Sequence, residues 1–268
     1  MEAVEKDSLT DRQTRIIEIV NQQGFATIET LANDFGVSYQ SVRRDIIKLD
    51  AGGVLQRFHG GVGIRETAAR LGYAEKQTLA TNAKQLIAGT ASSLIADGSV
   101  VFLDVGTTVE AVAETLRDRR QLRVFTTSLA VATILAGRPN INVFILGGTV
   151  GGADGSVVGE TTLATLMRFR FDYAVIGFSG IDQDGTPMDH DLEKVAIKQV
   201  AMEQSGCTLL VGDSSKFTKS AVVRFATNRK SIVFITETLL PAAISEKIPG
   251  QLIVAEPASL HCRPGVES

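Results

Sequence analysis

The sequence has little cysteine, and this excludes two kinds of small-protein architecture. Its 268 residues include only Cys207 and Cys262, which lie far apart, with no second cysteine beside either. A disulfide framework and a cysteine-rich zinc site both need several cysteines at short, regular spacings. We therefore expect neither of them in this protein.

Long apolar runs are missing as well. No run approaches the roughly 18 apolar residues that a transmembrane helix needs. The N-terminal stretch MEAVEKDSLTDRQ is charged and lacks the apolar segment of a signal peptide. With a formal net charge of −3, the chain is expected to be a cytoplasmic protein without a membrane partner.

The common catalytic motifs are also absent. The sequence contains no Gly-x-Ser-x-Gly elbow, no Walker phosphate loop and no paired-histidine motif. Asp189-His190-Asp191 could suggest a metal, but a single histidine among solvated carboxylates more often belongs to a loop. The sequence therefore indicates no catalytic residue, no cofactor and no metal.

What is present divides the chain into three parts. Residues 1–62 carry short helical patterns, residues 63–80 lack strong periodicity, and residues 81–268 alternate strand-like runs with helical patterns. The length suits one small domain and one of ordinary size. We expect a winged helix-turn-helix DNA-binding domain, a linker, and a larger Rossmann-like effector-binding domain, which together make an α/β protein.

The helix expected over residues 38–50 looks like a DNA-recognition helix. Ser38 is a good N-cap, and a buried stripe at helical spacing is formed by Val42, Ile46 and Leu49. The opposite face carries polar side chains that suit a DNA duplex, because Arg can grip guanine or phosphate and Gln can pair with adenine. That face consists of Gln40, Arg43, Arg44 and Ile47.

The flanking segments complete a winged helix-turn-helix. Helices are predicted over 11–22 and over 28–35, the second capped by Thr27, and Phe35-Gly36-Val37 forms the tight turn. A strand over 54–58 and a turn at 59–61 supply the wing. A small helical bundle with a charged solvent face is the alternative. The candidate DNA-binding residues are Ser38, Gln40, Ser41, Arg43, Arg44, Lys48, Arg57 and His59.

Positive charge in this region is local. Residues 1–62 hold seven Lys and Arg against nine Asp and Glu, whereas residues 38–62 hold four against two. Because phosphate contacts dominate DNA affinity, one such patch should bind weakly. A dimer presenting two patches would bind better, so we expect a homodimer or homotetramer.

Seven apolar runs predict the sheet of the second domain. Their near-continuous Val, Ile, Leu and Phe content suits parallel strands buried on both faces, and helical patterns such as 107–118 separate them. The runs are Ser99–Val105, Leu122–Thr127, Ile141–Leu146, Asp172–Gly177, Thr208–Gly212, Ser231–Thr236 and Gln251–Ala255.

Polar residues follow several of these runs, where ligands bind in parallel sheets. Glycines and hydroxyls before a helix suit a phosphate, carboxylates suit sugar or polyol hydroxyls, and lysines suit anions. The simpler alternative is that the Thr and Ser residues only cap helices. The candidate effector-binding residues are Asp104, Gly106, Thr107, Thr108, Thr127, Ser128, Gly147, Gly148, Asp182, Glu193, Lys198 and Lys216.

Several motifs together resemble the DeoR family of bacterial repressors. They are Arg43-Arg44-Asp45, Arg57-Phe58-His59-Gly60-Gly61, Asp104-x-Gly-Thr-Thr108, Gly147-Gly148, Ser179-Gly-Ile-Asp182 and Asp213-x-Ser-Lys216-Phe217. The resemblance implies dimers or tetramers that bind operator DNA and release it on binding a phosphorylated sugar or polyol. It also implies an effector domain similar to ribose-5-phosphate isomerases. The sequence departs from the family at Thr127, where Asn is usual, and at Tyr39-Gln40-Ser41.

The function expected from these features is a transcriptional repressor of a carbohydrate or polyol catabolic operon, released by glycerol-3-phosphate or a sugar phosphate. An alternative is a sugar-phosphate isomerase-like enzyme with an N-terminal helical appendage, in which Asp182, Asp189 or Glu193 would be the general base. In that alternative, the DNA-binding face of the helix over residues 38–50 would have no function. A constitutive DNA-binding protein with a degenerate sensor is a third possibility.

Overall fold

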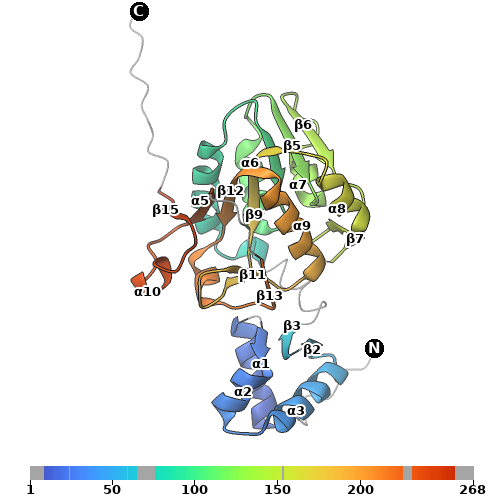
Figure 1. Ribbon diagram of the computed structural model, residues 1–268, viewed down its shortest axis with the longest axis vertical. Coiled ribbons are helices and arrows are strands. Elements are labelled where there is room, and N and C mark those ends of the chain that lie inside the picture. The colour runs from blue at the N-terminus through green and yellow to red at the C-terminus, as the bar shows by residue number, and fades with distance from the viewer. Residues whose placement is uncertain are drawn as a thin grey trace, which may run out of the picture.

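The computed structural model describes residues 9–23, 25–58, 60–64, 76–152, 154–225 and 231–256. Figure 1 shows a small helical unit below a larger unit built around a sheet. We call them the winged-helix domain (residues 9–64) and the α/β domain (residues 76–256). No helix in these ranges has both the length and the apolarity to cross a bilayer. His59, a candidate DNA-binding residue, lies outside the described residues.

The winged-helix domain has three helices and a three-stranded antiparallel sheet in the order β1-β3-β2. The predicted helices are confirmed, whereas β1 was not predicted, because three residues are too few to show a pattern. The elements are α1 (Asp11–Gln23), β1 (Phe25–Thr27), α2 (Ile28–Phe35), α3 (Tyr39–Ala51), β2 (Leu55–Phe58) and β3 (Gly61–Ile64).

Local chemistry fixes the helix-turn-helix as the sequence predicts. The Thr27 hydroxyl accepts a hydrogen bond from the Thr30 amide at 3.0 Å, and the Ser38 hydroxyl accepts one from the Ser41 amide at 3.2 Å. Gly36 ends α2 in the left-handed conformation at φ +61°, which favours glycine. The stripe expected on α3 is buried in the core of this domain.

The α/β domain is a seven-stranded parallel sheet in the order β15-β14-β12-β9-β4-β5-β6. Each of the seven predicted apolar runs overlaps one strand, although β9 and β12 begin before their runs, so the predicted α/β class is confirmed. The strands are β4 (Val100–Leu103), β5 (Leu122–Thr126), β6 (Ile141–Ile145), β9 (Phe171–Gly177), β12 (Ser205–Val211), β14 (Ile232–Thr236) and β15 (Gln251–Val254).

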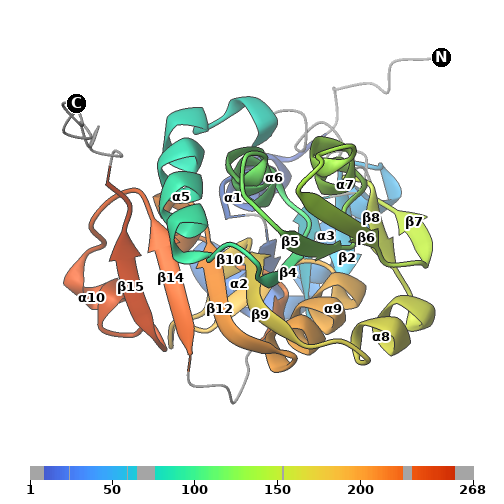
Figure 2. The same ribbon diagram turned by 90° about the horizontal axis from the view of Figure 1, so that it is seen from above.

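Helices cover both faces of this sheet, as Figure 2 shows. The helices α5, α6 and α7 pack on one face and contribute to one apolar core, while α8 and α9 pack on the other face and contribute to a second core. Their bounds are α5 (Thr81–Leu94), α6 (Thr107–Leu116), α7 (Leu129–Leu135), α8 (Glu160–Leu166), α9 (Leu192–Glu203) and α10 (Ala242–Ser245).

Short antiparallel elements follow the carboxyl ends of the strands, and the sequence did not predict them. They form a hairpin of β7 with β8 and a small sheet in the order β10-β11-β13. They are β7 (Thr149–Gly151), β8 (Ser156–Val158), β10 (Gly180–Ile181), β11 (Pro187–Asp189), a 3₁₀ helix (Ser214–Thr218) and β13 (Val223–Arg224). At two or three residues each, these strands are too short to give a periodic signal.

The strand order creates one switch point. From β4 the chain builds outward through β5 to β6, and it then returns to place β9 on the other side of β4. From β9 it builds in the opposite direction through β12 to β14 and β15. In open parallel sheets ligands bind beyond the carboxyl ends of the strands at such a point. The ends of β4 and β9 therefore mark where a binding site belongs.

Candidate functional site

The recognition face of α3 is exposed. Gln40, Arg43, Arg44 and Lys48 all lie on the surface of α3, and Arg57 is exposed on β2. None of these four cationic side chains forms an ion pair with another residue that the structure describes. The hydroxyls of Ser38 and Ser41 lie 3.0 Å apart at the start of the helix. The structure thus brings the described candidates for DNA contact together, with their charges available to a ligand.

Asp45, although part of the Arg-Arg-Asp motif, is buried under this face. Its carboxylate accepts hydrogen bonds from the Arg12 guanidinium at 2.6 Å and from the Gln13 side-chain amide at 3.0 Å. These contacts tie α1 to α3, and they orient the recognition helix from behind. Asp45 therefore positions the recognition helix α3 and is not itself exposed to DNA.

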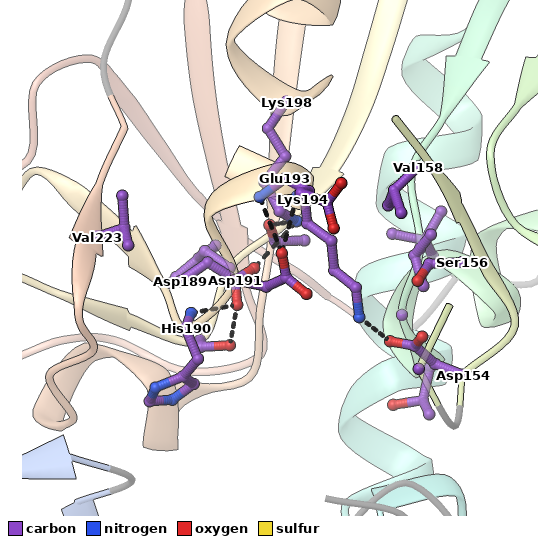
Figure 3. Close-up of a pocket in the computed structure, with 18 of the residues that line it drawn as sticks. Asp154, Ser156, Val158, Asp189, His190, Asp191, Glu193, Lys194, Lys198 and Val223 are labelled. Atoms are coloured by element: carbon purple, nitrogen blue, oxygen red, sulfur yellow. Dashed lines mark hydrogen bonds and ion pairs between the residues drawn. The ribbon is translucent and has the colours of Figure 1, made fainter. Parts of the chain in front are cut away.

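A cavity of about 660 Å³ opens at the switch point of the α/β domain. The ends of three neighbouring strands supply part of its wall, with Val105 and Gly106 after β4, Gly177 at the end of β9, and Val211 at the end of β12. Figure 3 shows the side chains that converge there from β11, α9 and the β7–β8 hairpin. This volume is that of a typical small-molecule site.

One wall of the cavity is the beginning of α6. Gly106 is the N-cap at φ +138°, and no side chain in the described part of the protein caps the helix. Thr107 and Thr108 follow it and line the cavity. The first amides of a helix have no partner within the helix, and the helix dipole favours negative charge there. The uncapped end, with two threonine hydroxyls, is therefore suited to a phosphate.

A buried ion triad forms the floor. The Lys198 ammonium on α9 contacts the Asp104 carboxylate, lies 3.2 Å from the Asp189 carboxylate, and donates to the Gly177 carbonyl at 2.8 Å. The side chains of Lys198 and Asp104 are each 3% exposed. Two acids around one lysine carry a net negative charge, so this lysine is already neutralised by protein.

The electrostatics of the triad follow from burial and proximity. Burial raises the pKa of the Asp104 carboxyl. Burial would also raise the pKa of Asp189, but the Lys198 charge and the His190 amide outweigh it and lower that pKa to about 2. Lys198 is buried too, yet the two carboxylates raise the pKa of its ammonium. Lys198 therefore stays charged, and its role is to hold β4, β11 and α9 together.

A second cation in the cavity has no such partner. Lys216, on the 3₁₀ helix after β12, lines the cavity, and its ammonium makes no hydrogen bond or ion pair with a described residue. Burial and repulsion by Lys76 lower the pKa of this ammonium to about 8. Burial also lowers the pKa of the neighbouring His190 imidazole. A half-buried lysine without an ion pair to a described residue is a suitable partner for an anionic ligand.

The opposite wall offers hydrogen-bond acceptors. Lys194 on α9 reaches across to Asp154 before β8 at 2.7 Å, as the dashed line in Figure 3 shows. The other Asp154 oxygen, Oδ1, is buried and has no hydrogen-bond partner among the described residues. Glu193 lies nearby at the start of α9. An unpaired buried acceptor fits a ligand hydroxyl.

The structure gathers half of the predicted effector residues at this cavity. Asp104 lies directly behind it in the triad. Gly106, Thr107, Thr108, Glu193, Lys198 and Lys216 line it.

The remaining candidates lie outside the cavity lining and have structural contacts. Ser128 caps α7 by accepting from the Val131 amide at 3.2 Å, which is what the simpler alternative predicted, and the Thr127 carbonyl accepts from Val157 at 2.7 Å. A side chain at Gly148 would collide with Thr162, and Gly147 accepts from that same threonine. Asp182 pairs with Arg224 at 3.1 Å.

Several residues of the cavity are not among the candidate effector-binding residues that the sequence indicates. Ser179, Asp189 and His190 line it, as do Asp154 and Ser156 of the β7–β8 hairpin. Asp189 and His190 were interpreted as a solvated loop, because nothing in the sequence shows that β11 returns to the switch point. The one available signal was the density of charged residues after β9. Within the described ranges, no cluster of three or more His, Cys, Asp or Glu side chains could hold a metal ion.

Comparisons with known proteins match both domains to one family. Residues 12–68 match the DeoR-like helix-turn-helix domain, and residues 79–238 match the DeoR C terminal sensor domain. The solved structure of ribose 5-phosphate isomerase A from Methanocaldococcus jannaschii is a distant neighbour, with a TM-score of 0.36 and 16% identity over 50% of this chain and 53% of that one. No conclusion rests on so distant a likeness.

Curated relatives are similar over most of the chain. The glycerol-3-phosphate regulon repressor of Escherichia coli is 33% identical over 92% of this chain and 98% of its own, and that of Haemophilus influenzae is 36% identical over 80% and 83%. The lactose phosphotransferase system repressor of Staphylococcus epidermidis is 32% identical over 85% and 91%. These names favour a regulator over the isomerase considered from the sequence. The chain belongs to the DeoR family of DNA-binding transcriptional repressors.

Proposed function

We propose that this protein represses a carbohydrate or polyol catabolic operon in the cytoplasm, and that a small phosphorylated compound bound in the cavity controls its release from DNA. Glycerol-3-phosphate and sugar phosphates are the candidate effectors. The observation that carries the proposal is the pairing of the uncapped start of α6 with the unpartnered Lys216 ammonium in one cavity. Both features favour a phosphate, and neither needs a metal or cofactor.

The effector also needs hydroxyl groups in this proposal. The phosphate lies at the start of α6 and Lys216, and the hydroxyls lie toward the unpaired Oδ1 of Asp154 and toward Glu193. The names of the similar repressors, which mention glycerol-3-phosphate and the lactose phosphotransferase system, support this class of ligand.

A thermal-shift screen tests the effector. Glycerol-3-phosphate and ribose 5-phosphate are compared with glycerol, ribose and inorganic phosphate, so that the two halves of the ligand are tested separately. A ligand at 100 times its dissociation constant stabilises the folded form by about 2.7 kcal/mol. We expect stabilisation by at least one phosphate ester and not by the sugar or polyol alone. Equal stabilisation by glycerol and glycerol-3-phosphate would refute the phosphate site.

On the DNA side, we propose that α3 enters the major groove and β2 contacts the backbone, in the manner of winged helices. We also propose a homodimer or homotetramer that binds repeated half-sites, because one winged helix with so few cations contacts few phosphates. Light scattering and a gel shift test this together. A monomer that binds a single half-site tightly would contradict the oligomer.

A further inference from the structure

The cavity is not made by the α/β domain alone. One lining residue, Gln56, lies on the wing strand β2 of the winged-helix domain, and another, Lys76, is the first described residue of the α/β domain. Figure 1 places β2 and β3 beside the β11 and β13 end of the α/β domain, and Val222 and Val223 near β13 also line the cavity. A ligand in the cavity would therefore face groups from both domains.

Lys76 is held at this position by a buried lysine. The side chain of Lys84 on α5 is buried, and its ammonium donates to the carbonyl of Lys76 and, at 2.8 Å, to the carbonyl of Leu79. Two carbonyls around one ammonium fix the backbone from 76 to 79 against α5. The Lys76 side chain itself is exposed and makes no hydrogen bond or ion pair with a described residue.

Lys76 adds a further ammonium group to the cavity that Lys216 lines. Its charge lowers the pKa of the Lys216 ammonium and of the His190 imidazole, so the two ammonium groups repel each other. An anion placed among them converts that repulsion into attraction. A dianionic phosphate in the cavity would thus draw the Lys76 side chain toward Lys216.

The wing strand β2 also connects the cavity with a residue that is a candidate for DNA contact. Gln56 is half-buried and lines the cavity, whereas the next residue, Arg57, is exposed. Successive side chains of a strand point to opposite faces, so β2 presents one side chain to the cavity and the next one away from it. A change in the position of Gln56 must move Arg57, because both belong to a strand that pairs with β3.

We propose that the effector site is shared between the two domains, with Lys76 binding the phosphate alongside Lys216 and with Gln56 contacting the bound effector from the wing. This inference rests on the proposed function. It adds two ligand residues, Lys76 at the start of the α/β domain and Gln56 on the winged-helix domain, and it identifies β2 as the element through which effector occupancy reaches DNA. Coupling of this kind needs the effector to favour one arrangement of the domains over the other.

Calorimetric titration of the full-length protein with glycerol-3-phosphate and with ribose 5-phosphate tests the first part. The variants are Lys76→Met, Lys216→Met and, as a matched control, Lys247→Met, which removes an exposed lysine outside the cavity. We expect the control to bind as the wild type does. Lys76→Met should bind about fivefold more weakly, since an exposed ion pair is a modest contribution, and Lys216→Met roughly thirtyfold or more weakly.

The possible results distinguish a failure of this inference from a failure of the proposed function. If Lys216→Met loses affinity and Lys76→Met keeps it, Lys76 is not a phosphate ligand and the proposed effector site stands. If neither phosphate ester binds the wild type, or if Lys216→Met binds as the wild type does, the proposed effector site is wrong and the shared site falls with it.

The second part is tested by the ratio of DNA affinities without and with saturating glycerol-3-phosphate. The DNA is a fragment that the protein selects from a random library. Allosteric coupling typically changes affinity by about 5- to 150-fold, and we expect Gln56→Ala to reduce the wild-type ratio at least threefold. Val54→Ala, an exposed position at the start of the same wing, is the control and should keep the ratio. An unchanged ratio in Gln56→Ala would overturn the role of the wing.

Discussion

The recognition face and the cavity both present cations to phosphate, but they do so in opposite surroundings. Arg43, Arg44 and Lys48 are exposed, and they make no ion pair with another described residue. In the cavity, Lys198 is held between the buried Asp104 and the half-buried Asp189 carboxylates, and Lys216 is half-buried without an ion pair to a described residue. Exposed charges are screened by salt, whereas buried charges are screened much less. The comparison teaches that DNA binding should respond to salt and effector binding to pH.

The largest effect is expected from the buried triad. Lys198→Met keeps the volume of the side chain and leaves the Asp104 carboxylate buried without its cation. Breaking a buried pair in this way costs about 3–5 kcal/mol of unfolding free energy. Urea titration followed by circular dichroism measures it, with the exposed Lys247→Met expected to change stability by less than about 0.5 kcal/mol. A loss below about 1 kcal/mol in Lys198→Met would show that the triad is not the anchor described above.

The next largest effect is expected on the affinity for DNA. Arg43→Ala and Arg44→Ala should each weaken DNA binding by about 1–3 kcal/mol, the usual loss for a bidentate base contact. Gel-shift titration at fixed salt is the measurement, and Arg168→Ala, an exposed arginine of the α/β domain, is the control. Affinity of the wild type should also fall steeply with added salt. Wild-type affinity in both arginine variants would show that α3 is not the DNA-recognition helix.

A smaller effect is expected in the pH dependence of binding, which should differ between the cavity and the recognition face of α3. Because the pKa of Lys216 is about 8 in the free protein, its ammonium is mostly charged at pH 7 and mostly neutral at pH 9. Affinity for glycerol-3-phosphate should therefore fall as pH rises through 8, by up to about tenfold. DNA affinity should change little, since arginine stays charged. The pH dependence of effector binding should disappear in Lys216→Met.

The smallest effect tests the entry to the recognition helix. Ser38→Ala removes the hydroxyl that accepts from the Ser41 amide, and an N-cap of this kind contributes about 1 kcal/mol. Thermal unfolding of the protein should show this loss. Ser38→Asp, which keeps an acceptor at the cap, should restore most of this stability. Equal stability of Ser38→Ala and Ser38→Asp would mean that the cap contributes nothing.

Much of the fold could be predicted from the sequence because it depends on local patterns. The stripe of Val42, Ile46 and Leu49, the caps Thr27 and Ser38, and all seven strands of the parallel sheet show in short stretches of sequence. The edge strands β6 and β15 are only partly buried, because each has one neighbour. The site was harder, because it depends on strand order. Successive strand ends were expected to share one pocket, yet β5 and β6 lie away from the switch point, so Thr127, Ser128 and Gly147 lie outside the cavity lining. Asp189 and His190 reach the cavity only through the fold of β11 against β10 and β13.

The central claim is that a phosphate ester in the cavity controls release from DNA, and one measurement tests it most directly. DNA affinity is measured with and without glycerol-3-phosphate and ribose 5-phosphate in the wild type, Thr108→Val and Lys216→Ala. Both variants keep the apolar core and the α3 face. We predict that a phosphate ester releases DNA from the wild type, while the variants stay bound at the same ligand concentration. Release of both variants at the wild-type concentration would contradict the account.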